Sequence, residues 1–178
     1  NVPVNIDACS LTVNTNAIAV IPSGYNVTLS GALTVVEGSS FTLENSANLI
    51  QSGTTNPNSG NITAKRDSSL LYLLDYTLWS SPVENQNLYA FSPNTLGNRF
   101  YVYNTPTDQY YPISPSDNFT LAKAYLIRVP KNYSSYVPAI YNGNFTGKPN
   151  SGNITFPLST AGSGYNAVGN PYPSQVNV

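Results

Sequence analysis

Short stretches in which apolar residues flank a Thr recur through the first part of the chain. Residues 11–13 (LTV), 27–29 (VTL) and 41–43 (FTL) share this pattern at spacings of 16 and 14 residues. Apolar runs at residues 17–20 and 47–50 lie in the gaps between them. Alternation with a period of two sends successive side chains to opposite faces of a strand, so each stretch predicts a half-buried β-strand.

The spacing of these stretches indicates an internal repeat. It divides residues 1–51 into units of about fifteen residues, each holding two short strands. Three such units could coil into a short β-solenoid, in which each unit gains stability by stacking on its neighbours. The same strands could instead form one layer of a β-sandwich. We favour the solenoid-like arrangement.

Beyond residue 51 the repeat ends and the chain changes character. Residues 52–60 are rich in Gly, Pro, Asn, Ser and Thr, which is typical of a linker or loop. Strands are predicted at 99–104 and at 122–130, where Pro130 removes the next backbone donor. Residues 67–81 have leucines near helical spacing, but their Tyr, Thr and Trp residues favour a strand.

Turn residues dominate the last part of the chain. Asn142-Gly143 supplies the two positive φ angles of a tight hairpin turn within residues 139–147. A second turn is predicted at 149–152, followed by another strand. Gly169 to Pro173 (GNPYP) predicts a rigid corner with Tyr172 packed onto a sheet, because two prolines restrict the residues before them; a ligand contact there is the less favoured alternative.

Together these patterns predict an all-β protein, since no long helical pattern occurs. The predicted order is a β-strand repeat (solenoid-like) region at residues 1–51, a linker at 52–60, and an antiparallel β-sandwich-like domain at 61–178. The C-terminal domain is expected to continue beyond residue 178. The chain begins at Asn1 and contains no Met, so its first residue is expected to follow a processing site or an upstream segment.

Charge is scarce in this sequence. Only 8 % of residues are charged, the net charge is −1, and the seven cations are scattered. Nucleic-acid binding, which needs clustered Lys and Arg, is therefore not predicted. No apolar run approaches the roughly 20 residues of a transmembrane helix, so no transmembrane segment is predicted. Cys9, the single cysteine, is expected to be a buried apolar side chain, with a bond to an outside partner as the alternative.

Candidate catalytic chemistry is sparse as well. The chain contains no His, which removes the usual base of nucleophilic triads and a common zinc ligand. The eight acidic residues form no distinctive pair, and no calcium-loop spacing occurs. We predict no enzyme and no catalytic, cofactor-binding or metal-binding residues. A hydrolase fragment stays open only if the fold brings two carboxylates together in a cleft.

Aromatic residues give one candidate site. Trp79, Tyr110 and Tyr111 are candidate carbohydrate-binding residues, because sugar C–H faces stack on flat rings. The competing interpretation is that these rings fill the core or brace neighbouring strands.

Several sequence stretches in the second part of the chain identify a family more specifically together than any of them does alone. They are LDYTLWSSPV (74–83), LYAFSPNTLGNRFYVYN (88–104), AKAYLIRVP (122–130), GNFTGKPNSGNI (143–154) and GYNAVGNPYPS (164–174). Over residues 61–174 the chain resembles a module of large secreted surface proteins of Bacteroidota, especially flavobacteria. The resemblance implies export by the type IX secretion system and a place on the outer cell surface or outside the cell. It implies no catalytic residues.

These observations favour a non-enzymatic extracellular structural or adhesin module of a larger cell-surface protein. Its expected partners are copies of itself, other surface proteins, or glycans, because a short repeat stack leaves open sheet ends. A carbohydrate-binding module using exposed Trp and Tyr is the alternative.

Overall fold

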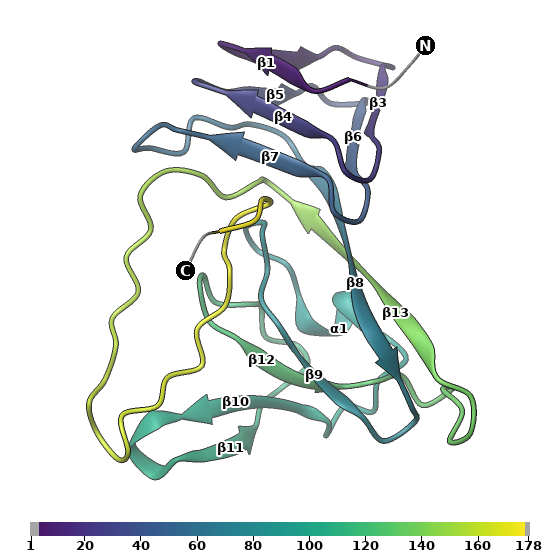
Figure 1. Ribbon diagram of the computed structural model, residues 1–178, viewed down its shortest axis with the longest axis vertical. Coiled ribbons are helices and arrows are strands. Elements are labelled where there is room, and N and C mark those ends of the chain that lie inside the picture. Colours follow the sequence, from purple (N-terminus) through teal and green to yellow (C-terminus); the bar gives the residue numbers. More distant parts are fainter. Residues whose placement is uncertain (1–3, 177–178) are drawn as a thin grey trace.

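Three parallel sheets make up the N-terminal part of the molecule (Figure 1). The computed structural model describes residues 4–176. The chain winds through these sheets in successive turns, each visiting all three. The strands of the first turn are β1 (Ile6–Ala8), β2 (Leu11–Val13) and β3 (Ile18–Ile21), and those of the second are β4 (Asn26–Leu29), β5 (Leu33–Val35) and β6 (Ser40–Leu43). The third turn contains β7 (Asn48–Gln51), a bridge from Ser59 to Thr34, and β8 (Ile62–Leu71).

The repeat therefore differs from the predicted one. Leu11 pairs with Leu33 and Ile18 with Ser40, so one turn is 22 residues long and holds three strands rather than two. The three stretches matched in the sequence belong to β2, β4 and β6, which lie in three different sheets. The prediction of fifteen-residue units was wrong because an apolar-Thr-apolar pattern suits every strand and does not distinguish one sheet from another.

Residues with positive φ mark the true period. Asn16, Gly38 and Gly60 have φ of 65°, 79° and 76° and occupy equivalent corners of the three turns. Gly24 and Ser46, at 83° and 65°, repeat the device at another corner. Left-handed backbone favours Gly and Asn, so these positions set where the chain changes from one sheet to the next.

Apolar side chains of the turns point inward and stack. Val27, Leu29, Leu33 and Leu43 are fully buried. An asparagine column runs along one corner: the Asn26 backbone N–H donates to Asn5 Oδ1 (2.9 Å), and Asn48 Nδ2 donates to Asn26 Oδ1 (2.8 Å). Each turn is thus fixed on its neighbour by both packing and hydrogen bonds.

The two ends of the stack are treated differently. In the described part of the chain, β1, β2 and β3 are end strands of their sheets, so the first turn has free edges. At the other end the C-terminal segment covers β7, because the Leu49 N–H donates to Pro173 O (2.9 Å) and the Gln175 N–H to Asn48 Oδ1 (3.1 Å). Within residues 4–176 the stack is therefore covered on the side of its third turn and open on the side of its first.

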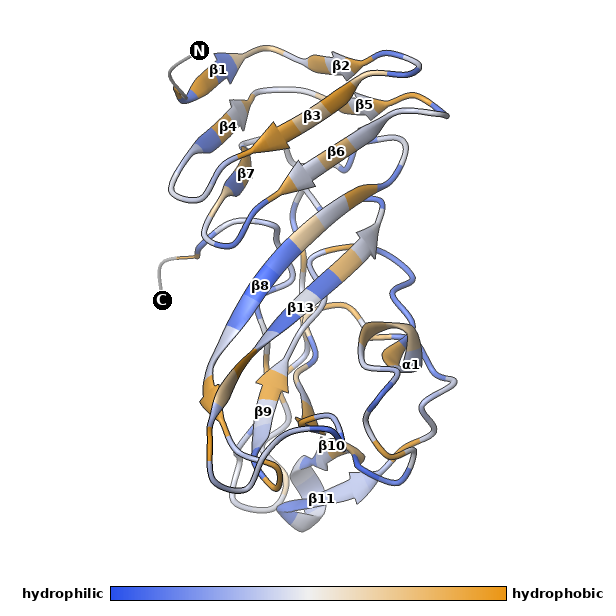
Figure 2. Ribbon diagram, turned by 90° about the vertical axis from the view of Figure 1, so that its right-hand side faces the viewer, coloured by the Kyte–Doolittle hydropathy of each residue, from blue (hydrophilic) through white to orange (hydrophobic). Residues whose placement is uncertain are grey.

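Strand β8 connects the turns to the rest of the molecule (Figure 2). It pairs in parallel with β6 and antiparallel with β13 (Ala139–Gly147), giving a sheet of order β13-β8-β6-β3. A second four-stranded sheet is antiparallel with order β11-β10-β12-β9. Its strands are β9 (Tyr76–Trp79), β10 (Phe100–Asn104), β11 (Gln109–Pro112) and β12 (Tyr125–Arg128); the short helices are α1 (Leu88–Phe91) and η1 (Thr105–Thr107). The predicted all-β class is confirmed.

Two local predictions for this part have different outcomes. Residues 67–81 form strands rather than a helix, but a turn at 72–75, where the Asp75 N–H donates to Tyr72 O (3.0 Å), separates β8 from β9. The tight hairpin at Asn142-Gly143 was wrong, because both residues lie inside β13. A Cβ on Gly143 would lie 2.9 Å from Phe91 Cε2, so glycine is needed here for close packing and not for a turn.

The last segment is extended but forms no strand. Residues 148–176 run along the molecule as a long irregular stretch, so the strand predicted after residue 152 is wrong (Figure 1). Asp108 accepts hydrogen bonds from both the backbone and the side chain of Ser163. The chain bends at residues 172–174, where the corner was predicted. Tyr172 was predicted to pack onto a sheet, but its Oη donates to Gly152 O (2.8 Å), which lies in the irregular segment.

A single hydrophobic cluster spans both parts of the chain. It includes Leu33 and Phe41 from the parallel turns, Ile62 from β8, and Phe100 and Ile127 from the antiparallel sheet. Within residues 52–60 only Asn58 is buried, at 6 % exposed, and it ties this otherwise exposed segment to Leu33 and Gln51 by hydrogen bonds. Cys9, by contrast, is exposed, so the expectation that it is a buried apolar side chain was wrong.

Replacing Asn58 with Ala is expected to lower the free energy of unfolding by about 1–3 kcal/mol. Asn58 Oδ1 accepts from the Leu33 N–H (2.8 Å), and Nδ2 donates to Gln51 Oε1 (2.8 Å). Truncation leaves a buried backbone donor without a partner. Urea denaturation measures the change, and Asn61→Ala, an exposed neighbour, is the control. Equal stability of the two variants would contradict the role given to Asn58.

Candidate functional site

Trp79 is a core residue. Its side chain is only 9 % exposed, and its ring contacts Phe91, Tyr141 and Phe145 at centroid distances of 5.1, 5.9 and 6.1 Å. It therefore does not present the open ring face that the predicted carbohydrate site requires. The competing interpretation, that this ring fills the core, describes Trp79.

Tyr110 and Tyr111 lie on the edge strand β11 and are 39 % and 43 % exposed. Successive residues of a strand point to opposite faces, so these two rings do not form one platform. Tyr110 packs against Tyr103 at a centroid distance of 5.2 Å. Strands β11 and β9 are the two outer strands of their sheet, so the structure does not bring these tyrosines together with Trp79.

A cavity of about 520 Å³ lies where the third parallel turn meets the C-terminal segment. Its wall is rich in neutral polar groups, and Phe119 and Leu121 add apolar surface. The polar lining residues are Thr54, Thr55, Asn56, Ser81, Glu84, Asn85, Asn150, Ser151 and Asn153. We refer to this space as the amide cavity.

Two residues hold the framework of the amide cavity in place. Glu84 Oε1 pairs with Lys148 Nζ (2.8 Å) and accepts from Asn56 Nδ2 (3.1 Å). Asn150 is 4 % exposed and donates from Nδ2 to Ser81 O (3.3 Å) and Pro171 O (2.9 Å). With its carboxylate already paired, the cavity presents a mainly neutral surface.

Other polar groups of the amide cavity are available to a ligand. Asn85, Asn153 and Thr54 are exposed, and Asn85 has a left-handed φ of 59°. Ser151 Oγ is buried without a hydrogen-bond partner. Neutral amides and hydroxyls beside an apolar wall suit a neutral polyhydroxylated ligand. The sequence carries one signal of this site, the Asn-containing stretches at 54–58 and 150–153, which by themselves indicate only a linker and a turn.

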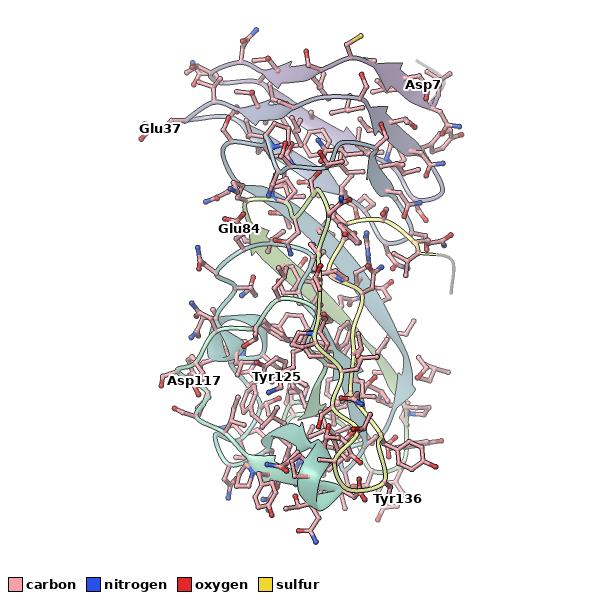
Figure 3. The ribbon with its side chains drawn as sticks, turned by 90° about the vertical axis from the view of Figure 1, so that its left-hand side faces the viewer. Asp7, Glu37, Glu84, Asp117, Tyr125 and Tyr136 are labelled. Atoms are coloured by element: carbon pink, nitrogen blue, oxygen red, sulfur yellow. The ribbon has the colours of Figure 1, made fainter. Side chains whose placement is uncertain are left out.

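Acidic side chains are spread along the molecule rather than gathered. Asp7, Glu37, Glu84 and Asp117 lie far apart in Figure 3. Within residues 4–176, no group of three or more His, Cys, Asp or Glu side chains could hold a metal ion. None of the helices in this range is long and apolar enough to span a membrane.

Tyr141 makes the stability of the folded protein depend on pH in the alkaline range. Burial raises the pKa of Tyr141 above its ordinary value of 10.0, and Tyr141 Oη donates to Phe91 O (2.6 Å). The neutral phenol is favoured in the folded protein, so this stabilisation is complete below pH 10 and is lost as pH rises above it. We expect Tyr141→Phe to make the alkaline loss of stability shallower.

Urea denaturation at pH 8 to 11 measures this effect. Tyr136→Phe is the matched control, because Tyr136 is 91 % exposed. The same slope of stability against pH in Tyr141→Phe and the unmodified chain would contradict the assignment.

The fold defines a β-rich module with cavities on its surface and, among the described residues, no cluster of side chains that could hold a metal ion. The chain belongs to a family described as a domain of unknown function, DUF8693, whose match covers residues 1–178. Comparison with curated proteins gave no match, and neither did comparison with solved structures.

Proposed function

We propose that this chain is a non-enzymatic extracellular structural or adhesin module of a larger secreted surface protein. The observation that carries the proposal is the stack of parallel 22-residue turns, which shares one core with the antiparallel sheets. In this proposal the stack is a short β-solenoid and the two four-stranded sheets form a sandwich-like body. Such stacks present long, rigid surfaces and are suited to spacing and adhesion.

Composition supports the same proposal. The chain contains no His, and only 8 % of its residues are charged. The resemblance to secreted proteins of Bacteroidota supports export by the type IX system. A protein that acts through shape needs a stable framework more than it needs titrating side chains.

Surface labelling tests the location. An antibody against this chain is expected to label intact cells of the source organism, and protease treatment of intact cells is expected to remove the label. Labelling only after lysis would contradict a surface role. Inactivating the type IX machinery is expected to retain the protein inside the cell; an unchanged surface amount would contradict this export route alone.

Self-association through the first turn is part of the proposal. The Leu11 N–H and Val13 O bond to the second turn, so by alternation the backbone groups of Thr12 face the free edge. Sedimentation is expected to show concentration-dependent association that Thr12→Pro weakens. Leu74→Ser, at an exposed position in the turn between β8 and β9 and away from the first turn, is the control. A monomer at all concentrations would contradict assembly between copies.

Carbohydrate binding is the second candidate, and the amide cavity favours it. We place the contacts at Asn85 and Asn153, because their side chains are exposed at its wall. A glycan array is expected to identify a neutral ligand, and each Asn→Ala change is expected to weaken binding by about 3- to 10-fold. Tyr110→Ala and Tyr111→Ala distinguish the sites: loss of binding only in these variants would move the site to β11.

A further inference from the structure

Arg66 is a cation on the inner face of strand β8. Ala64 and Ile62, two and four residues before it on the same face, are buried. Its Nη1 donates to Lys65 O (2.7 Å), whereas Nη2 is buried and has no hydrogen-bond partner. Burial lowers the pKa of Arg66, and no carboxylate contributes to that change.

Both ion pairs found among residues 4–176 involve other cations, Lys65 and Lys148. Arg66 is only partly buried, but its Nη2 is covered, and a covered cationic N–H that has neither a hydrogen-bond acceptor nor a counter-charge is costly. The chain has only seven cations, and the inward placement of Arg66 without an acidic partner favours a role in binding an anionic group.

A cavity of about 290 Å³, partly open to solvent, lies beside Arg66. Ser80 also lines it, and Ser80 Oγ is buried without a hydrogen-bond partner. The other polar lining groups are already engaged: Asn170 Oδ1 accepts from the Tyr172 N–H (2.9 Å), and Tyr172 Oη donates to Gly152 O. Leu78, Trp79 and Val168 supply apolar walls. We call this space the Arg66 cavity.

The GNPYP stretch forms one side of the Arg66 cavity. A Cβ on Gly169 would lie 2.2 Å from Ser80 Cβ, so only glycine allows this segment to approach so closely. The corner predicted from sequence therefore also shapes a binding space.

We propose that the Arg66 cavity binds a small organic carboxylate of about monosaccharide size. The guanidinium and the Ser80 hydroxyl donate to the carboxylate oxygens, and the apolar walls pack against the body of the ligand. A volume of 290 Å³ is at the small end of ligand cavities, which suits one sugar acid or one amino-acid-sized acid. Because Nη2 is covered in the empty cavity, binding includes a small shift of the guanidinium or of the 169–172 segment.

Calorimetric titration of the whole chain tests the proposal. The probes are galacturonate as a sugar acid, N-acetylalanine as a non-sugar acid, galactose as the neutral match of the first, and inorganic phosphate. Saturable binding is expected for a carboxylate but not for galactose. If galacturonate binds more tightly than N-acetylalanine, the ligand class is a sugar acid. If N-acetylalanine binds more tightly, the ligand class is a peptide-type acid. Equal binding of galactose and galacturonate, preference for phosphate, or no carboxylate binding overturns the proposal.

Variants separate binding from a structural role. Arg66→Gln is expected to weaken carboxylate binding by about 10- to 100-fold, and Arg99→Gln, which lies outside the cavity, is expected to leave it unchanged. Without ligand, Arg66→Met is expected to keep or raise the melting temperature. A bound carboxylate is expected to raise the melting temperature of the unmodified chain but not that of Arg66→Met. A lower melting temperature in Arg66→Met with unchanged binding in Arg66→Gln would assign Arg66 to the framework and overturn the proposal. The proposal is independent of the surface role, because labelling of cells and binding of acids can fail separately.

Discussion

Replacing Gly60 with Ala is expected to lower the free energy of unfolding by about 3–5 kcal/mol. Gly60 has a φ of 76°, and a Cβ there would lie 1.9 Å from Val35 O. The substitution therefore combines left-handed strain with a clash against backbone of the neighbouring turn. Val35 O and Val35 C, which a Cβ would meet at 1.9 and 2.8 Å, are backbone atoms and not the end of a flexible side chain. Relieving the clash therefore requires separating the second and third turns.

Gly38 is the matched control for this substitution. It occupies the equivalent corner one turn earlier with a φ of 79°, but a Cβ there would meet its nearest atom, Thr15 Cγ2, at 3.6 Å. Gly38→Ala is expected to cost about 1–2 kcal/mol from backbone strain alone. Urea denaturation followed by the fluorescence of the single Trp measures both variants. Equal losses would contradict the close stacking of turns.

Replacing Trp79 with Ala is expected to lower the free energy of unfolding by about 3–5 kcal/mol. The indole lies against Phe91, Tyr141 and Phe145, and its removal leaves a cavity between the two four-stranded sheets. Urea denaturation followed by far-ultraviolet circular dichroism measures the loss. Tyr136→Ala, at a 91 % exposed position, is the control and is expected to change stability by less than about 0.5 kcal/mol.

Trp79→Ala is not an informative variant for testing carbohydrate binding. A destabilised Trp79→Ala chain would lose any ligand through unfolding, so Tyr110, Tyr111, Asn85 and Asn153 are the informative positions. A Trp79→Ala variant that keeps its stability but loses glycan binding would contradict the core assignment. It would favour the aromatic site instead.

The all-β class could be predicted because alternation of apolar and polar residues is a local property. Strands at 99–104 and 122–130 appear as β10 and β12 for this reason. The length of the repeat could not be obtained in the same way. Thr12 and Thr34 are partners in adjacent turns, but the same apolar-Thr-apolar signal also occurs in strands that never pair. The 22-residue period is carried by the corner residues with positive φ, by the identical LTV stretches at 11–13 and 33–35, and by Asn26 and Asn48.

The structural role of Gly143 could not be read from the sequence either. Gly143 suggested a hairpin, yet its place inside β13 is fixed by Phe91, which is far away in the sequence. The sequence therefore shows that a small residue is needed but not whether a turn or a neighbour needs it.

The candidate sites depended even more on tertiary structure. The sequence makes Trp79 a candidate binding residue, whereas the structure surrounds its ring with Phe91, Tyr141 and Phe145. Arg66 lies on β8 and Ser80 follows β9, and the two line one cavity together with residues 168–170 and Tyr172. Local patterns contain no information on which polar groups remain without partners after folding.

The parallel turns and the antiparallel sheets share one hydrophobic cluster, so we expect them to unfold as one unit, which the proposed role as a surface module requires. Native-state hydrogen exchange of the unmodified chain and of Gly60→Ala tests it most directly. Amides of β6 and of β12 are expected to open with the same free energy and to lose protection together in Gly60→Ala. Wild-type protection of β12 in that variant, with loss only in the turns, would contradict the claim.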